Sequence, residues 1–306
     1  MTPATPEVMP PDPDDASSDF AYIFFISSFF FRRWPASAAS LRRPRDLDRP
    51  APHRPRPLHL LAALRASGAH QIAAVAFDSP ISARHRLSML YRLRVLDRFR
   101  PFRRVGTAPN HWVLDAVGAM VVAAERGVEV EELHWRRDRA LGLADSTQLA
   151  HRVGVNGFFC SLLGAARRAD DAELRLWWPE RRCRATWGEV VRPDGYGVWA
   201  DAGREVAFFL EYDRGTETHE RLAAKLDGYA TMATASKDPF WVLFWFPGPK
   251  REAAARKALG SAPVPVATGR HGEAPAGGVW LPVGSTESRR HRLAELAAVV
   301  PPGVEG

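Results

Sequence analysis

Three acidic side chains are spaced so that they could meet at one end of a β-sheet. The apolar run 206–210 has no polar alternation, which is typical of a central strand buried on both faces. Glu211 and Asp213 end this strand, and residues two apart on a strand point to the same side. A turn at 201–204 predicts a hairpin with the preceding strand, 190–199, so Asp194 is expected opposite Glu211. We therefore expect the three carboxylates to converge.

Such a cluster could hold a divalent metal ion. Like charges close together raise one another's pKa unless a cation lies between them. Carboxylates are hard oxygen ligands that suit Mg²⁺ or Mn²⁺, so Asp194, Glu211 and Asp213 are candidate metal ligands. The alternative is a salt-bridge cluster without a metal. The arginines near enough in sequence to neutralise the carboxylates in that case are Arg192, Arg204 and Arg214.

Three short segments in this order carry a resemblance to known proteins. They are RPDGYGVW at 192–199, FFLEYDRGTE at 208–217 and KLDGY at 225–229. An aspartate after proline, a hairpin and an acidic pair ending an apolar strand resemble the PD-(D/E)xK nuclease superfamily. More narrowly, the three segments together resemble the actinobacterial replication-relaxation family, over roughly 57–283. This resemblance implies a restriction-endonuclease-like domain and a role in plasmid or conjugative-element replication and DNA relaxation.

The chain departs from the superfamily pattern at one position. Where the superfamily has a lysine two residues after the acidic residue, this chain has Asp213. The lysine could come from the next helix, 216–233, in which Lys225 lies on the inward side beside the apolar stripe that includes Leu222. The alternative is an edge residue whose amine reaches water.

The resemblance implies roles for the four residues in Mg²⁺- or Mn²⁺-assisted phosphodiester hydrolysis. Asp194 and Glu211 would hold the metal, which activates water and stabilises charge on the phosphate. Asp213 would complete the metal shell or orient the water, and Lys225 would neutralise charge in the transition state. The missing lysine at position 213 favours the alternative of a non-catalytic DNA-binding accessory or regulatory factor with a degenerate nuclease-like domain.

The N-terminal part of the chain predicts a winged helix-turn-helix. Helices are expected from Leu60 to about 67, over 71–77 and over 81–94, followed by strands 95–102 and 111–114 around a basic loop. In the third helix the residues expected to be buried are Ala83, Leu87, Leu90 and Tyr91.

This fold predicts a DNA-binding surface on the third helix and on the wing. The third helix would face bases and phosphates in the major groove, and the wing would contact backbone phosphates. The alternative is a protein–protein module with a solvated basic face. The candidate DNA-binding residues are Arg84, His85, Ser88 and Arg92 on the helix, and Arg98, Arg100, Arg103 and Arg104 on the wing.

The remaining segments complete an α/β (α+β) architecture. Residues 1–57 are interpreted as a disordered or spurious extension, 58–128 as the winged helix, 129–168 as a helical connection with the first helix of the next domain, and 169–300 as the nuclease-like domain. Helical periodicity from Arg136 is expected to break at Gly154, before a buried helix at 155–166. His151 and Asn156, near that break, are expected to be a surface histidine and a helix cap, and Glu180 to form a salt bridge. The order α-β-β-β-α-β-α-β predicts a mixed sheet with helices on both faces, with strands at 174–178, 190–199, 206–210, 240–246 and 279–283.

Composition restricts the class of protein further. The net charge of +7 favours an anionic partner, DNA, with replication or conjugation proteins as further candidate partners. Cys160 and Cys183 lack a CxxC spacing, which argues against structural zinc or a disulfide framework and suits the cytoplasm. The apolar island 20–31 is too short to span a bilayer as a helix, so no stable membrane insertion is expected.

Overall fold

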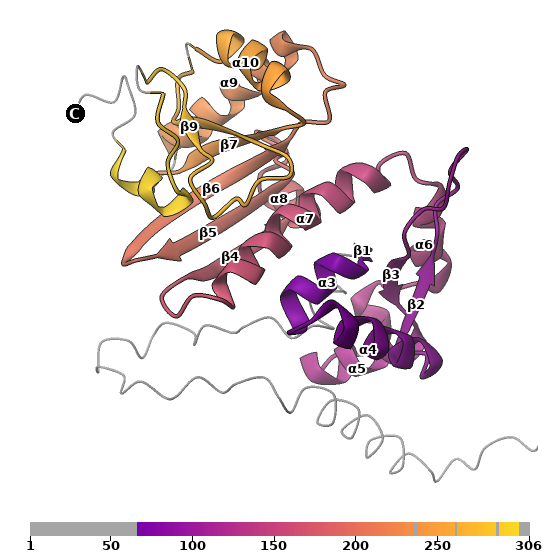
Figure 1. Cartoon of the computed structure of the whole chain (residues 1–306). Coiled ribbons are helices and arrows are strands. Elements are labelled where there is room, and N and C mark those ends of the chain that lie inside the picture. Colours follow the sequence, from indigo (N-terminus) through magenta and orange to yellow (C-terminus); the bar gives the residue numbers. More distant parts are fainter. Residues whose placement is uncertain (1–65, 236–237, 261, 286–287, 300–306) are drawn as a thin grey trace, which may run out of the picture.

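The computed structural model describes residues 66–235, 238–260, 262–285 and 288–299, and it shows a small and a large β-sheet connected by helices (Figure 1). The extension 1–57 and the predicted first helix from Leu60 lie outside these described residues. Within them, the predicted mixed α/β architecture is confirmed.

The small sheet belongs to the N-terminal part of the described chain. Its elements are β1 (Ser67–Gly68), α3 (Ala69–Ala76), α4 (Pro80–Arg92), β2 (Leu96–Phe99), β3 (His111–Leu114) and α5 (Ala116–Arg126), with the antiparallel strand order β1-β3-β2. Helix α4 begins at a Ser79 cap that accepts a hydrogen bond from the Ser82 backbone N–H, and Pro80 is its first residue.

The second and third predicted helices and the hairpin are thus confirmed as elements, whereas the complete winged helix stays a prediction because its first helix is not described. Two details of the prediction are wrong. Tyr91 is exposed, because its ring lies at the edge of the Trp112 ring and under the Arg98 guanidinium rather than in the core. The first hairpin strand ends at Phe99, so Phe102 lies in the loop and is 91% exposed.

A helical connection leads to the larger sheet. It consists of η2 (Val130–Leu133), α6 (Arg137–Leu141), η3 (Gly142–Asp145) and α7 (Leu149–Ala166). The predicted break at Gly154 is wrong, because α7 runs through this residue without interruption. Glycine is needed there for space: a Cβ at position 154 would lie 2.3 Å from the ring of Tyr212.

In the described residues the large sheet has six strands in the order β4-β5-β6-β7-β8-β9. The strands are β4 (Glu173–Pro179), β5 (Gly195–Asp201), β6 (Arg204–Tyr212), β7 (Trp241–Phe246), β8 (Val266–Arg270) and β9 (Leu281–Pro282). Strands β6, β7 and β8 are parallel and the remaining neighbours antiparallel, so the predicted mixed sheet is confirmed. Strand β8 was not predicted from the sequence.

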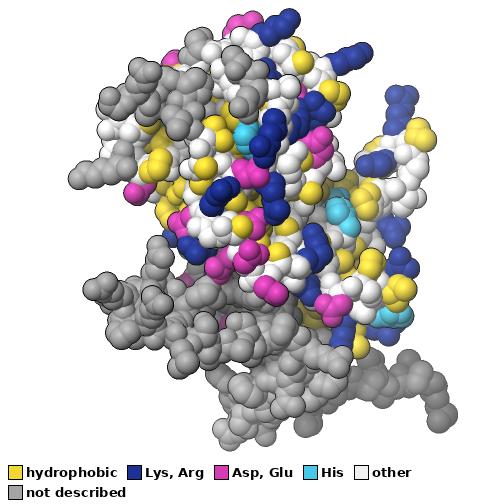
Figure 2. Space-filling view, turned by 60° about the vertical axis from the view of Figure 1, so that its left-hand side comes forward, with side chains coloured by type: hydrophobic (Ala, Val, Ile, Leu, Met, Phe, Trp, Pro, Cys, Tyr) yellow, Lys and Arg dark blue, Asp and Glu magenta, His cyan; other side chains and the backbone are white. Residues whose placement is uncertain are grey.

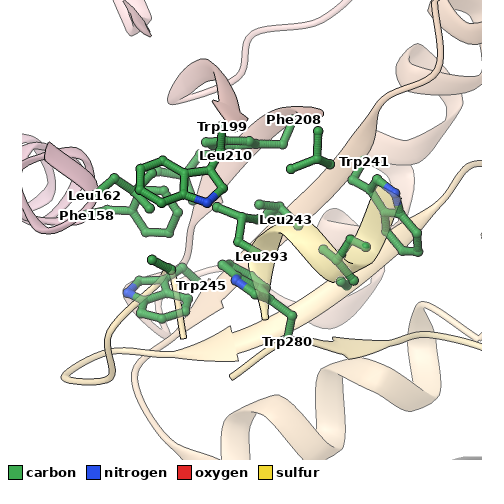
Figure 3. Packing of buried hydrophobic residues seen from close by; sticks show 14 of the residues in the cluster. Phe158, Leu162, Trp199, Phe208, Leu210, Trp241, Leu243, Trp245, Trp280 and Leu293 are labelled. Atoms are coloured by element: carbon green, nitrogen blue, oxygen red, sulfur yellow. The ribbon is translucent and has the colours of Figure 1, made fainter. Parts of the chain in front are cut away.

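Helices cover both faces of this sheet (Figure 1). Helix α7 and η4 (Leu293–Ala298) pack on one face, and α9 (His219–Ala235) and α10 (Pro249–Ala258) pack on the other, while α8 (Glu180–Trp187) follows β4. Figure 3 shows the core on the α7 face, where side chains of α7 meet the aromatic residues of the central strands. Alternation along β6 sends Phe208 and Leu210 to the α7 face and Phe209 to the α9 face. Among the described helices, none is long and apolar enough to cross a bilayer.

Candidate functional site

The hairpin β5–β6 brings Asp194 to Glu211, as the sequence predicts. The strands pair from Asp201 with Arg204 to Gly195 with Leu210, so the next residue of each strand lies at the same sheet end. Ala202 and Gly203, with φ of 50° and 75°, form a tight turn of the kind that matches strand twist. The backbone N–H of Asp194 donates to the Leu210 carbonyl at 3.0 Å, and its carboxylate accepts from the backbone N–H of Tyr212 at 2.7 Å. Asp194 is thereby fixed by backbone bonds on both sides.

Glu211 is buried and is held by two side chains of α9. Lys225 Nζ lies 2.8 Å from one carboxylate oxygen, and the Tyr229 hydroxyl donates to the other at 2.6 Å. Lys225 also forms an ion pair with Glu217 at 3.0 Å. Leu222, Leu226 and Tyr229 form the buried stripe of α9 that the sequence predicts. Lys225 therefore points inward, toward the acidic pair.

Burial and neighbouring charges shift the pKa values of Glu211, Lys225 and Tyr229. Burial raises the pKa of Glu211 to about 7, and the charge of Asp194 adds to the rise although Lys225 opposes it. Burial disfavours the charged form of Lys225, but the carboxylates of Glu211 and Glu217 outweigh it and raise the pKa of Lys225. The pKa of Tyr229 is raised well above its ordinary value by burial and by Glu211, so this hydroxyl acts as a donor. The result is a carboxyl group that titrates near neutral pH beside a permanent cation.

Asp213 is held by residues other than those that hold Asp194 and Glu211. Its side chain is 1% exposed and pairs with Arg251 of α10 at 2.7 Å, and it also accepts from the backbone N–H of Gly215 at 2.9 Å. Arg251 in turn donates to the Glu217 carbonyl and contacts His219. The structure therefore brings together Asp194, Glu211 and Lys225, whereas it binds Asp213 to an arginine from another helix.

His151 belongs to the candidate site, although the sequence suggested a surface histidine. Its Nε2 atom lies 2.8 Å from Asp194 Oδ1, and its ring meets that of Tyr212 edge-on. Burial lowers the pKa of His151, but the hydrogen bond and charge of Asp194 outweigh burial and raise it. The spacing of His151 to Val155 and Phe158 places all three on one side of α7, and this periodicity could have indicated an inward histidine.

Asn156 also differs from its expected role as a helix cap. It is buried inside α7, and its Nδ2 atom donates to the Ala66 carbonyl at 2.8 Å. This bond fastens α7 to the small unit, which comprises residues 66–126 and the elements β1 to α5. Glu180, at the start of α8, is exposed and lies near enough to His151 to raise its pKa.

The donor set at the sheet end can be compared with the needs of a metal ion. Mg²⁺ is commonly bound through one or two carboxylates, with water and phosphate oxygens completing its shell. Asp194 and Glu211 fit this requirement in donor type and lie at the same sheet end, but each of their oxygens already has a protein partner, which a metal ion would have to replace or share. Within the described residues no three His, Cys, Asp or Glu side chains form a group that could hold a metal by themselves. Asp213 is likewise engaged, by Arg251 and by the backbone N–H of Gly215.

The predicted DNA-binding residues lie mostly on the surface. On α4, Ala83, Leu87 and Leu90 face the core, while Arg84, His85 and Arg92 are exposed and Ser88 is half-buried. On the hairpin, the Arg98 guanidinium lies over the rings of Tyr91 at 4.7 Å and Trp112 at 5.7 Å, and Arg100 Nε donates to Asn110 at 2.7 Å. Arg103 and Arg104 are exposed at the hairpin tip, between Phe102 and Val105.

The fold and these sites define a class: a mixed α/β protein with a basic helix–hairpin unit and an Asp–Glu–Lys cluster at the end of a six-stranded sheet. A sequence profile of the replication-relaxation proteins matches residues 58–239, which is more than half of the chain. The chain therefore belongs to the replication-relaxation family. No curated protein and no solved structure matches it.

Proposed function

We propose that this protein binds duplex DNA during replication of plasmids or other mobile elements, through α4 and the β2–β3 hairpin. Family membership supports a role in such replication. The net charge of +7 suits a polyanionic partner. Figure 2 shows many Lys and Arg side chains on the face turned toward the viewer, with Asp and Glu side chains among them.

The observation that carries this proposal is the contact between α4 and the hairpin. The Arg98 guanidinium stacks on Tyr91, so the exposed arginines of the helix and those of the hairpin belong to one continuous surface. A duplex against this surface would meet Arg84 and Arg92 from the helix and Arg103 from the hairpin. Contacts to phosphates would position the duplex, and contacts to base edges would add sequence preference.

The proposal is tested by the affinity of the full chain for a fluorescent duplex, measured by anisotropy over a range of salt. Arg84→Ala and Arg92→Ala should each weaken binding and lower the salt dependence, because each removes a cation from the surface. Arg221→Ala, an exposed arginine on α9, is the matched control. Unchanged affinity of both variants at moderate salt would remove the proposal.

A second candidate function is phosphodiester hydrolysis at the sheet end. It is favoured by the position of Lys225, which reaches Glu211 beside Asp194 although it comes from a different element than the superfamily lysine. A divalent ion held by Asp194 and Glu211 would supply an activated water and stabilise phosphate charge. Lys225 would neutralise charge that develops on the phosphate, Tyr229 orients Glu211, and His151 orients Asp194.

Cleavage of supercoiled plasmid with Mg²⁺ or Mn²⁺ tests this second function. Nicking or linearisation should be abolished by Asp194→Ala and by Glu211→Ala, and retained by Asp170→Ala, which removes an exposed carboxylate elsewhere. Intact plasmid that shifts on a gel, with binding that weakens steeply as salt rises, would instead favour the non-catalytic DNA-binding factor.

A further inference from the structure

A deep groove lies beside α4, between the small unit and the C-terminal end of α7. Its volume is about 940 Å³. The wall is formed by α3, by one side of α4, by the base of the β2–β3 hairpin and by the last turn of α7 with the residues after it. This volume is at the upper end of the range for ligand-binding clefts. The groove is therefore large enough to take a nucleotide-sized group.

The groove has a buried apolar floor. Ala83 and Leu87 of α4, Ala73 of α3 and Trp112 of β3 line it, and each is at most 9% exposed. Leu87 and Trp112 also belong to the apolar core of the small unit. Polar groups that could accept or donate hydrogen bonds to a ligand come from Ser88 and from Asn110 at the hairpin.

The rim of the groove is strongly cationic. Arg84 and Arg98 line it from the small unit, and Arg167 and Arg168 line it from the end of α7. Asp78 is the one carboxylate among the described lining residues, and it pairs with Arg167 at 2.8 Å. Four arginines and one aspartate line the groove, and this excess of positive charge makes it complementary to an anionic chain.

Only some of the predicted DNA-binding residues of α4 line the groove. Arg84 and Ser88 are four residues apart and line the groove, whereas His85 and Arg92 are not among its lining residues. A ligand that spans the exposed face of α4 would therefore also enter the groove. There it would also meet Arg167 and Arg168, the two residues that follow α7.

We propose that this groove binds the sugar–phosphate backbone of one DNA strand, with Arg168, just after the end of α7, as a phosphate ligand. The inference rests on the proposed DNA-binding function and extends it to residues that follow a helix outside the small unit. Arginine suits this role because its planar fork of donors matches phosphate oxygens. Arg168 lies against Gly164, with an arginine nitrogen 3.4 Å from where a Cβ at position 164 would be, so its side chain folds along the groove wall.

The experiment compares two matched pairs of variants of the full chain, with duplex affinity measured by anisotropy between about 50 mM and about 200 mM salt. Arg168→Ala is paired with Arg126→Ala, an exposed arginine at the end of α5. Ala74→Glu is paired with Ala74→Gln. Ala74 is exposed on α3 and lines the groove, so both substitutions add the same bulk and only Glu adds a negative charge.

Loss of one phosphate contact should lower the slope of log affinity against log salt by about 0.9. When the salt concentration rises fourfold, the affinity of wild type and of Arg168→Ala should both fall. The factor by which wild-type affinity falls should be roughly 3.5 times the factor for Arg168→Ala. Ala74→Glu should weaken binding, whereas Ala74→Gln and Arg126→Ala should stay within about twofold of wild type.

The failure of this inference differs from the failure of the proposed function. If Arg92→Ala weakens binding while Arg168→Ala and Ala74→Glu bind like wild type, the groove is not a DNA site but the α4 surface still is. If Ala74→Gln weakens binding as much as Ala74→Glu, bulk rather than charge is responsible, and the phosphate assignment is wrong. A wild-type chain that binds no duplex would overturn both.

Discussion

Replacing Lys225 with methionine should destabilise the protein in a strongly pH-dependent way. The substitution keeps most of the apolar stem of the side chain but removes the cation 2.8 Å from the buried carboxylate of Glu211. Removing one partner of a buried ion pair costs about 3–5 kcal/mol, because the carboxyl group left behind must either bury a charge without compensation or take up a proton. A third of the Lys225 side chain is exposed to water, so the lower value, about 3 kcal/mol, applies above neutral pH.

At lower pH the cost should be smaller. The pKa of Glu211 is raised to about 7 in the folded protein, from an ordinary value of 4.5. Between these two pKa values the folded state therefore keeps a proton on Glu211 that the unfolded state has lost. The contribution of this group to stability is lost as pH rises toward the folded-state pKa. At about pH 5 the Lys225→Met variant buries a neutral carboxyl and loses a hydrogen bond worth about 1 kcal/mol. The loss of unfolding free energy caused by Lys225→Met should thus be about 2 kcal/mol larger at the higher pH than at the lower pH.

Urea denaturation of wild type and Lys225→Met at about pH 5 and about pH 8 measures this difference. Lys257→Met, an exposed lysine on α10, is the control and should show little change at either pH. Adding Glu211→Gln to Lys225→Met removes the stranded charge and should restore most of the stability lost at the higher pH. Equal losses at the two pH values would refute the reasoning, because they would show that the charge of Glu211 does not change between them.

Two further predictions concern packing. Gly154→Ala should lower the unfolding free energy by about 1–3 kcal/mol, since its methyl group would overlap the Tyr212 ring, whereas Gly142→Ala, which has open space around it, should be nearly neutral in the same urea titration. Cys160 and Cys183 should not react with thiol reagents in the native protein and should both react in denaturant, because burial raises the pKa of each thiol to about 12. Rapid labelling of either thiol before unfolding would contradict that burial.

The local parts of the candidate site could be predicted from sequence because they depend on strand periodicity. The apolar run 206–210 within β6, the tight turn after Asp201 and the side-chain alternation at Glu211 are all properties of neighbouring residues. The inward position of Lys225 can be predicted in the same way, because its spacing to Leu222 and Tyr229 places it on the inner side of a helix. Such patterns fix the face on which a side chain lies.

Local sequence patterns do not determine which residue a side chain will contact. The pairing of Asp213 with Arg251 joins residues 38 positions apart, with helix α9 and strand β7 between them, so no local sequence pattern predicts it. His151 and Asp194 are 43 positions apart, and their contact depends on how α7 crosses the sheet end. Strand β8 was missed because Val266–Arg270 is short and contains Thr268 and Gly269, which weaken an apolar strand signal, although the strand is buried between β7 and β9.

The apolar pattern of helix α7 predicts how much of the helix is buried, although it does not identify the elements that cover it. Its C-terminal half is apolar around most of its circumference, and such a helix must be buried on more than one side. The sheet covers only one side, through Phe158 and Leu162. Cys160 and Leu163 point elsewhere and pack against Val75 of α3. An apolar surface too wide for one interface thus required a second one, and this second interface is what joins the small unit to the six-stranded sheet.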